Sequence, residues 1–228
     1  MAYPMAPFDW LKRDAAGLVT IVVQDRHTGL VRMVAHADEQ ALAATLESGY
    51  AHFFSRSRKK LWKKGEESGN LLRVFEVWAD CDADCLVYLV DPSGPSCHTG
   101  RETCFFRRVQ ADGSLVDEPA ELASPTFPRL VHELEARRDA SADKSYTRSL
   151  LDKGAAKIAE KIREEGDELA RAVESESDAR VVSESADVVY HMLVGLLSRK
   201  LSLRDVQVEI ARRFGISGHD EKASRGPK

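Results

Sequence analysis

The first half of the chain alternates short apolar runs with turn residues, which is the pattern of β-strands joined by turns. The runs are LVTIVVQD at 18–25, LVRMVAH at 30–36, AHFFSRS at 51–57, LLRVFEVWAD at 71–80, CLVYLV at 85–90 and CFFRRV at 104–109. The turn sequences TG, SGN, PSGPS and HTG punctuate this half. We therefore predict a mostly β region from Gly17 to about Arg108.

One segment in this half has helical spacing instead. DEQALAATLESG, residues 38–49, begins with Asp38, a favoured N-cap residue, and ends with Gly49, which is typical just past a helix. The first domain is therefore predicted to be mainly β, of the α+β class.

After Pro128 the strand pattern is absent, and apolar residues recur at helical spacing. The predicted helices cover 130–137, 149–173, 179–200 and 203–214. Four successive helices favour an antiparallel all-α bundle. The stretch QADGSLVDEPAELASPTFP between the halves holds three prolines and reads as a linker. We predict a domain over 1–112, a linker over 113–127, a helical domain over 128–216 and a mobile tail over 217–228.

Composition narrows the class of protein. The 228 residues are 43% hydrophobic and 31% charged, with a net charge of −4, which argues against a general nucleic-acid or membrane-surface protein. The N-terminus lacks a signal-peptide pattern, and no run of about 18 apolar residues exists, so we expect a cytoplasmic protein without a membrane span. All four cysteines lie within 81–104, which in a reducing cytoplasm favours a metal site or reactivity over disulfides.

Residues 80–85, DCDADC, concentrate acids and thiols. Read as a strand continuing from LLRVFEVW, a period of two places Asp80, Asp82 and Asp84 on one face and Cys81 and Cys85 on the other. Carboxylates about 7 Å apart repel one another, and Mg²⁺, which prefers oxygen ligands, would relieve that repulsion. The alternative is a solvated loop.

The thiols suit Zn²⁺, with Cys97 and Cys104 of CHTGRETC as further ligands. A catalytic zinc keeps three protein ligands and one open position, whereas four cysteines would close the site and make it structural. The sequence pattern leaves open whether Cys85 is a fourth ligand, and small buried thiols are the alternative for the whole set.

Two further segments carry charge. SRSRKKLWKKG at 55–65 is either an anion-binding loop, a nucleic-acid or nuclear-localisation patch, or a solvated face, and its Trp62 either stacks on a base or joins the core. The helical half contains acids at i,i+3 and i,i+4 spacing, which form either an oxygen cage for Mg²⁺ and a polyphosphate or a solvated helix face. These acids are Glu164, Glu165, Glu168, Glu184 and Asp187.

SRSRKKLWKKGEESGN, followed by DCDAD, CHTG and CF, resembles phosphoribosyl-AMP cyclohydrolase of histidine biosynthesis over about residues 17–108. The resemblance implies a largely β zinc hydrolase that forms a homodimer, with the zinc cysteines supplied by both subunits. Its zinc ligands fall on Cys81, Cys97 and Cys104, and its magnesium ligands on Asp80, Asp82 and Asp84. Cys85 then remains as a core thiol. His36 in VAHAD departs from the usual family sequence.

In that family, zinc supplies hydroxide at neutral pH, which adds to C6 of an adenine ring so that the N1–C6 bond opens. His98 is the candidate for moving protons, with Asp84 as a second catalytic residue. A turn-packing or ligand-orienting role for His98 is the alternative. The resemblance implies substrate binding by Ser55, Arg56, Ser57, Arg58, Trp62, Lys64, Gly65, Ser68, Gly69, Asn70 and Thr99.

SYTRSLLDKGAAKIAEKIREEGDELARA and ESADVVYHMLVGLL resemble phosphoribosyl-ATP pyrophosphohydrolase, an all-α MazG-like enzyme, over about residues 128–215. Its EExxE and ExxD motifs fall on the five acids above, which the resemblance makes Mg²⁺ ligands. Gly166 stands where alanine is usual and is expected to loosen the helix by about 1 kcal/mol. Lys157 and Lys161 either contact phosphate or pair with Glu165; we assign substrate binding to Lys161 and pairing to Lys157.

Together the two resemblances imply a bifunctional, dimeric enzyme acting on small nucleotides. The helical domain would cleave phosphoribosyl-ATP, and the β domain would open the ring of the resulting phosphoribosyl-AMP. One rival hypothesis is a general nucleotide-sanitising pyrophosphohydrolase with an inactive zinc domain. Another is a four-cysteine structural zinc module with an RNA-binding loop, joined to a dimerisation bundle.

Overall fold

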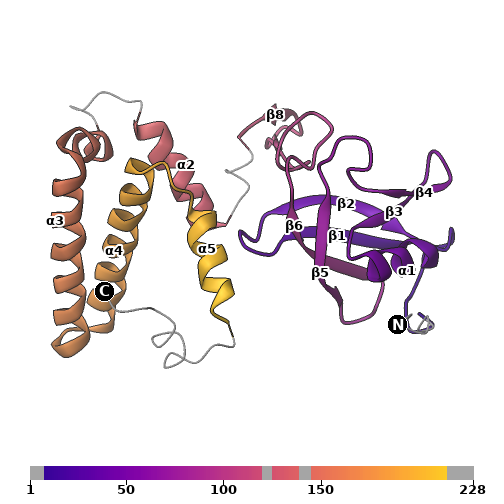
Figure 1. Cartoon of the computed structure of the whole chain (residues 1–228), viewed down its shortest axis with the longest axis horizontal. Helices are drawn as coiled ribbons and strands as arrows, with labels where there is room; N and C mark the ends of the chain where they lie inside the picture. The colour runs from indigo at the N-terminus through magenta and orange to yellow at the C-terminus, as the bar shows by residue number, and fades with distance from the viewer. Residues whose placement is uncertain (1–7, 120–124, 139–144, 215–228) are drawn as a thin grey trace. The chain divides into compact units, whose positions relative to one another are not determined.

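The computed structural model describes residues 8–119, 125–138 and 145–214. The chain divides into two compact units, Met1–Pro125 and Thr126–Lys228. The first unit is rich in strands, and the second is helical (Figure 1). The predicted layout, with a strand-rich domain followed by a helical one, is confirmed.

The first unit is built around a four-stranded sheet with the order β2-β1-β6-β5. Strand β1 pairs antiparallel with β2 and parallel with β6, and β5 pairs antiparallel with β6. Two antiparallel hairpins, β3–β4 and β7–β8, complete the strands of the unit. The strands are β1 (Val19–Asp25), β2 (Val31–Ala37), β3 (His52–Ser55), β4 (Lys60–Lys63), β5 (Leu72–Ala79), β6 (Cys85–Pro92), β7 (Arg107–Val109) and β8 (Leu115–Asp117).

The core of this unit follows from strand alternation and from one helix. Every second residue of β1 is buried, as the period of two requires. Helix α1 (Glu39–Ser48) contacts β3, whose Phe53 is fully buried. The helix is capped as predicted, because the Asp38 carboxylate accepts a hydrogen bond from the Ala41 backbone N–H at 2.8 Å, and Gly49 ends it in the left-handed conformation (φ 70°).

The second unit contains α2 (Thr126–Arg138), α3 (Tyr146–Ser175), α4 (Asp178–Ser198) and α5 (Leu203–Arg212). Its core consists of Leu134, Leu150, Ile158, Leu193 and Val194. Within the described residues, α4 is the one helix long and apolar enough to span a membrane by composition. Its Leu193 and Val194 side chains are buried in the core of the unit.

The strand prediction for DCDADC is wrong. Strand β5 ends at Ala79 and β6 begins at Cys85, so residues 80–84 form the turn that joins two antiparallel strands. Asp80 explains the turn, since its carboxylate accepts hydrogen bonds from the backbone N–H groups of Asp84 (3.1 Å) and Cys85 (3.2 Å). A short acidic side chain that satisfies nearby backbone donors favours a turn over a strand.

The linker prediction is also wrong in part. Leu115–Asp117 forms β8 and pairs with β7, so the strand-rich unit extends further than residue 112. Helix α2 begins at Thr126, two residues before the predicted helical domain. The tail predicted over 217–228 lies outside the described residues.

Glycine interrupts α3 at a place that the helical spacing does not reveal. Gly154 has φ 80° and ψ −177°, so the helix is kinked there. Gly166, the glycine predicted to loosen the helix, lies in an uninterrupted stretch.

Candidate metal centres

The β5–β6 turn, residues 80–84, gathers three carboxylates. One oxygen from each of Asp80, Asp82 and Asp84 lies within 4.8 Å of the others, and all three residues are exposed. The negative charges of Asp82 and Asp80 raise the pKa of Asp84. Partial desolvation raises the pKa of Asp80, but the hydrogen bonds from Cys85 and Asp84 lower it by a larger amount. The net shift is therefore downward. Such mutual repulsion is what a divalent cation with oxygen ligands relieves.

The cysteine loop, residues 94–104, places two thiols side by side. Cys97 is buried, and the hydroxyl of Thr99 donates a hydrogen bond to its sulfur at 3.1 Å. Burial and the neighbouring Cys97 raise the pKa of Cys104 to about 11, although the residue keeps exposed surface. Burial raises the pKa of Cys97 as well, but the hydrogen bonds from Thr99 and Cys104 and the charge of Lys64 together outweigh burial, so the net shift is downward. The ring Nδ1 of His98 lies 4.0 Å from the Cys97 sulfur.

The third predicted zinc ligand, Cys81, lies in the exposed β5–β6 turn. Within the described residues, the groups of three or more side chains close enough to share one metal contain carboxylates alone. A single chain therefore does not bring Cys81 together with Cys97 and Cys104. Cys85 is half-buried at the start of β6 rather than part of the apolar core.

The basic segment, residues 55–70, contains a tight hairpin. The Ser55 hydroxyl accepts hydrogen bonds from the backbone N–H of Arg58 (3.2 Å) and from its Nε (3.3 Å). Arg56 and Ser57 at the tip are exposed. Trp62 packs against the core, with its ring centroid 5.2 Å from that of Phe53. Of the two alternatives for Trp62, the structure therefore favours the core.

The basic segment also approaches the cysteine loop. Gly65 has φ 82°, and a β-carbon there would collide with the backbone of Asn70. The side chain of Asn70 lies in turn against Gly94, where a β-carbon would collide with Oδ1. Ser68 and Gly69 complete this bend, since the Ser68 hydroxyl accepts from the Asn70 N–H at 3.3 Å and the Gly69 N–H donates to the Gly65 carbonyl at 2.9 Å.

Lys64 interacts electrostatically with both thiols. Burial lowers the pKa of Lys64, and the neighbouring Cys104 and Cys97 oppose that shift. Burial and then the charge of Arg56 lower the pKa of His36, the residue that departs from the family sequence. Lys64 is thus a residue of the basic segment that interacts with the cysteine loop.

Three acids of the helical unit form the acidic group, Glu165, Glu184 and Asp187, with carboxylate oxygens within 4.8 Å of one another. Glu165 and Glu184 are buried, with 7% and 2% of their surface exposed. Burial raises the pKa of Glu184; the Arg180 guanidinium, 2.5 Å away, opposes this shift, and nearby carboxylates add to it. Closely spaced carboxylates repel one another, and their oxygens are ligands that Mg²⁺ prefers, so this group suits Mg²⁺.

The remaining predicted ligands lie outside the acidic group. Glu164 is exposed and pairs with Lys161 at 2.9 Å, and Glu168 lies 3.9 Å from Arg171. Lys161 also contacts Glu165 at 3.0 Å. The predicted pairing of Lys157 with Glu165 is wrong: Lys157 pairs with Glu160 at 2.6 Å, one helical turn away.

Two residues of this site were missed in the sequence. His191 is buried, and its Nδ1 lies 2.9 Å from the Asp187 carbonyl oxygen and 3.7 Å from Glu165 Oε1. Because a carbonyl only accepts, Nδ1 carries a hydrogen, and Nε2 is hydrogen-bonded to the Tyr146 hydroxyl at 3.2 Å. The signal was present, since His191 follows Asp187 by four residues and so shares its helix face.

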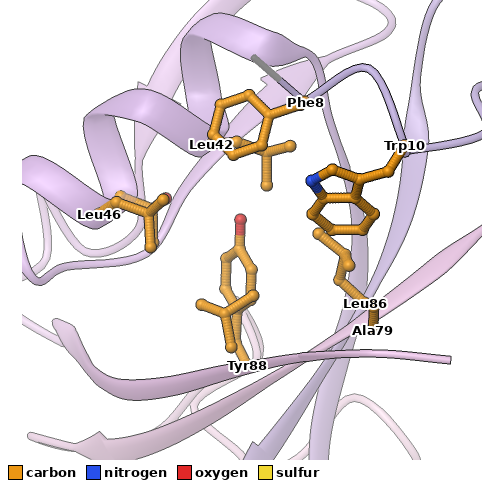
Figure 2. Close-up of a pocket in the computed structure, with 9 residues that line it drawn as sticks. Phe8, Trp10, Leu42, Leu46, Ala79, Leu86 and Tyr88 are labelled. Atoms are coloured by element: carbon orange, nitrogen blue, oxygen red, sulfur yellow. The ribbon is translucent and has the colours of Figure 1, made fainter. Parts of the chain in front are cut away.

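An apolar pocket of about 200 Å³ lies in the first unit, between α1 and the sheet (Figure 2). Phe8, Trp10, Leu42 and Leu86 line it, and the Tyr88 hydroxyl points into it. Its lining includes no acid, cysteine or histidine. The pocket therefore lacks the groups that metal-assisted hydrolysis requires.

The donor atoms decide which ions fit. Two adjacent thiols suit Zn²⁺, and the carboxylate groups of both units suit Mg²⁺. Residues 33–106 match the family model for phosphoribosyl-AMP cyclohydrolase, and residues 127–214 match the family model for phosphoribosyl-ATP pyrophosphohydrolase. The protein is therefore a two-domain hydrolase with a cyclohydrolase and a pyrophosphohydrolase in one chain.

Relatives that match most of the chain are named as bifunctional proteins. The chain is 42% identical over 221 residues to the histidine biosynthesis bifunctional protein HisIE of Wolinella succinogenes, covering 95% of each chain. It is 41% identical over 205 residues to HisIE of Aquifex aeolicus, covering 90% of this chain and 98% of the relative. A chloroplastic relative from Arabidopsis thaliana is 41% identical over 225 residues, with coverage of 95% and 79%. The chain belongs to the HisIE family, and both resemblances found in the sequence are confirmed.

Proposed function

We propose that the helical unit hydrolyses phosphoribosyl-ATP to phosphoribosyl-AMP and pyrophosphate with Mg²⁺, and that the β unit opens the N1–C6 bond of phosphoribosyl-AMP with Zn²⁺. The observation that supports this division is the pair of chemically different donor sets. Buried carboxylates gather in one unit, and adjacent thiols gather in the other. Each unit would then carry out one of two consecutive steps.

In the helical unit, Glu165, Glu184 and Asp187 would hold Mg²⁺, with Glu164 and Glu168 as additional ligands. The ion, when bound, neutralises charge that develops on the triphosphate. Lys161 lies close enough to the acids to contact phosphate once Glu165 turns to the ion. This unit fits the MazG-like class of helical pyrophosphohydrolases.

In the β unit, Cys97 and Cys104 would bind zinc together with Cys81 of a second subunit. This sharing accounts for the separation of Cys81 from the other two thiols within one chain. The ion, when bound, lowers the pKa of a water molecule toward 7 and so supplies a nucleophile at neutral pH. His98, beside Cys97, would transfer the proton that N1 of the ring receives as the bond opens.

Other residues of the β unit would hold the substrate. Asp80, Asp82 and Asp84 would bind Mg²⁺ at the β5–β6 turn, and Asp84 would also contact the reacting water. Arg and Lys side chains of the basic segment would bind the two phosphates. A cytoplasm, which keeps thiols reduced, is the proposed location.

The test is a coupled assay on the purified full-length protein, with phosphoribosyl-ATP as substrate. Pyrophosphate release reports the first step, and the ultraviolet spectrum of the opened ring reports the second. Glu165→Gln should abolish pyrophosphate release but still open the ring of phosphoribosyl-AMP when that nucleotide is supplied directly. Cys104→Ala should release pyrophosphate but leave the ring closed. Chelator should stop both steps.

The control variant is Cys85→Ala, which should keep zinc and both activities. Loss of zinc in Cys85→Ala as complete as in Cys97→Ala would instead support a four-cysteine structural site. Faster hydrolysis of ordinary nucleoside triphosphates than of phosphoribosyl-ATP would contradict the proposed substrate.

A further inference from the structure

Arg32 is a buried arginine on β2, with 4% of its surface exposed. A buried guanidinium loses its hydration, so proteins retain one where hydrogen bonds and opposite charge compensate it. None of the assignments above uses Arg32. Its contacts lead to the cysteine loop.

The backbone of β2 is shaped to turn this side chain inward. Val23 of β1 pairs with Met33, but the next residue, Gln24, pairs with Val31, so Arg32 is the extra residue of a β-bulge. Arg32 and Met33 are consequently both buried, although neighbours in a regular strand point to opposite faces. Bulges often re-aim a side chain next to a functional site.

The Arg32 side chain contacts the cysteine loop at three points. Its Nε donates to the Ser96 hydroxyl at 3.0 Å, and its Nη2 donates to the Gly94 carbonyl at 2.8 Å. Its Nη1 lies 3.6 Å from the carboxylate of Glu102, which is largely exposed. The hydrogen bond to Ser96 is buried, and Ser96 directly precedes Cys97 in the chain.

The main chain of Arg32 holds the other end of the same loop. The Cys104 N–H donates to the Arg32 carbonyl at 2.9 Å. One residue thus anchors the segment just before Cys97 through its side chain and Cys104 itself through its backbone. Both thiols are tied to a single point on the sheet.

We propose that Arg32 is a positioning residue that fixes the cysteine loop so that Cys97 and Cys104 face one metal ion before the ion binds. The inference rests on the proposed zinc role of these thiols. Residues that orient metal ligands from outside typically change metal affinity about 10- to 100-fold when they are replaced. Arg32 acts through the loop and not through contact with substrate.

The test measures metal binding by the full-length, metal-stripped protein without substrate. Zn²⁺ affinity is determined by competition with a chromogenic chelator, and Co²⁺ is used to record the thiolate charge-transfer absorption. Arg32→Met should weaken Zn²⁺ binding about 10- to 100-fold and reduce the cobalt band. Arg32→Lys keeps the positive charge but loses the planar guanidinium with its several N–H donors, so its Zn²⁺ affinity should lie between those of the parent and Arg32→Met. The matched control is Arg26→Met, because the Arg26 guanidinium stacks on the ring of Phe75, 4.0 Å from its centroid. Its Zn²⁺ affinity should stay within about twofold of that of the parent.

Ser96→Ala keeps the test decisive if Arg32→Met fails to fold. It removes one acceptor of Arg32 and should weaken Zn²⁺ binding about fivefold, the effect of one hydrogen bond. If Arg32→Met folds, adding Ser96→Ala to it should have no further effect, because both changes break the same contact. Zn²⁺ affinities of the folded Arg32 and Ser96 variants within twofold of the parent would overturn the proposal. Absence of the cobalt band in the parent itself would instead refute the zinc assignment of the proposed function.

Discussion

The ammonium of Lys161 lies 3.0 Å from the carboxylate of Glu165, a member of the acidic group. The same ammonium lies 2.9 Å from Glu164, and its hydrogen bonds to Glu164 and then Glu165 raise the pKa of Lys161. Lys161 therefore supplies part of the positive charge that the metal-free acidic group needs. Under the proposed function, Mg²⁺ would compete with Lys161 for the Glu165 carboxylate.

This competition predicts that Lys161→Met destabilises the metal-free protein more than the Mg²⁺-loaded protein. In chelator, the variant leaves the charge of Glu165 without the Lys161 ammonium that balances it. The unfolding free energy should fall by about 1 kcal/mol, a loss between those typical of exposed and of buried ion pairs. Excess Mg²⁺ should remove most of that difference. Urea unfolding followed by far-ultraviolet circular dichroism measures both.

Lys157→Met is the matched control, because Lys157 lies on the same helix and pairs with Glu160 alone among the acids named here. It should change stability by less than about 0.5 kcal/mol, with or without Mg²⁺. An equal loss in both variants would mean that Lys161 acts as an ordinary surface ion pair.

The raised pKa of Glu184 predicts a pH dependence of stability in chelator. A carboxyl group whose pKa is higher folded than unfolded binds more protons in the folded state, so stability falls as pH rises above about 4.5. Glu184→Gln should remove this component. Glu160→Gln should show the opposite behaviour. The hydrogen bond and the charge of Lys157 lower the pKa of Glu160, so the stabilisation by the ionised Glu160 is lost as pH falls. Chemical unfolding across this pH range, compared between parent and variants, checks both signs.

Most elements could be predicted from the sequence because their periodicity reflects burial. Alternate residues of β1 are buried, and helix α1 lies between Asp38 and Gly49 as the capping residues indicate. The strand interpretation of residues 80–84 was wrong and its loop alternative was right, because alternating acids and thiols imitate a strand. Its deciding interaction, from Asp80 to two backbone N–H groups, depends on where the chain reverses.

The sequence indicated which residues belong to the candidate site better than it indicated which of them come together in the fold. Motif spacing identified the acids, but it could not separate Glu165, which is buried, from its exposed neighbour Glu164, because that depends on how α3 packs against α4. Arg32 was missed for a related reason. A β-bulge turns its side chain inward, and a regular period of two does not include such a bulge.

The Thr99 hydroxyl predicts the reactivity of Cys97. By donating to the sulfur at 3.1 Å it favours the thiolate, so Thr99→Val should raise the pKa of Cys97 and Thr99→Ser should preserve it. The measurement is alkylation of the metal-stripped protein across pH, resolved by residue with mass spectrometry. The exposed Cys81 serves as the internal control and should keep its profile. An unchanged midpoint for Cys97 in Thr99→Val would show that burial and neighbouring charges alone set its reactivity.

Two glycines of α3 predict opposite effects of the same substitution. Gly154 has φ 80° and ψ −177°, a conformation that strains other residues, so Gly154→Ala should cost about 1–3 kcal/mol. Gly166 lies in regular helix, so Gly166→Ala should stabilise by up to about 1 kcal/mol. A β-carbon meets no neighbouring atom within 4 Å at either position, so backbone conformation rather than packing separates them. Urea unfolding of the two variants gives the signs directly, and destabilisation by Gly166→Ala would show that this stretch of α3 needs the freedom of glycine.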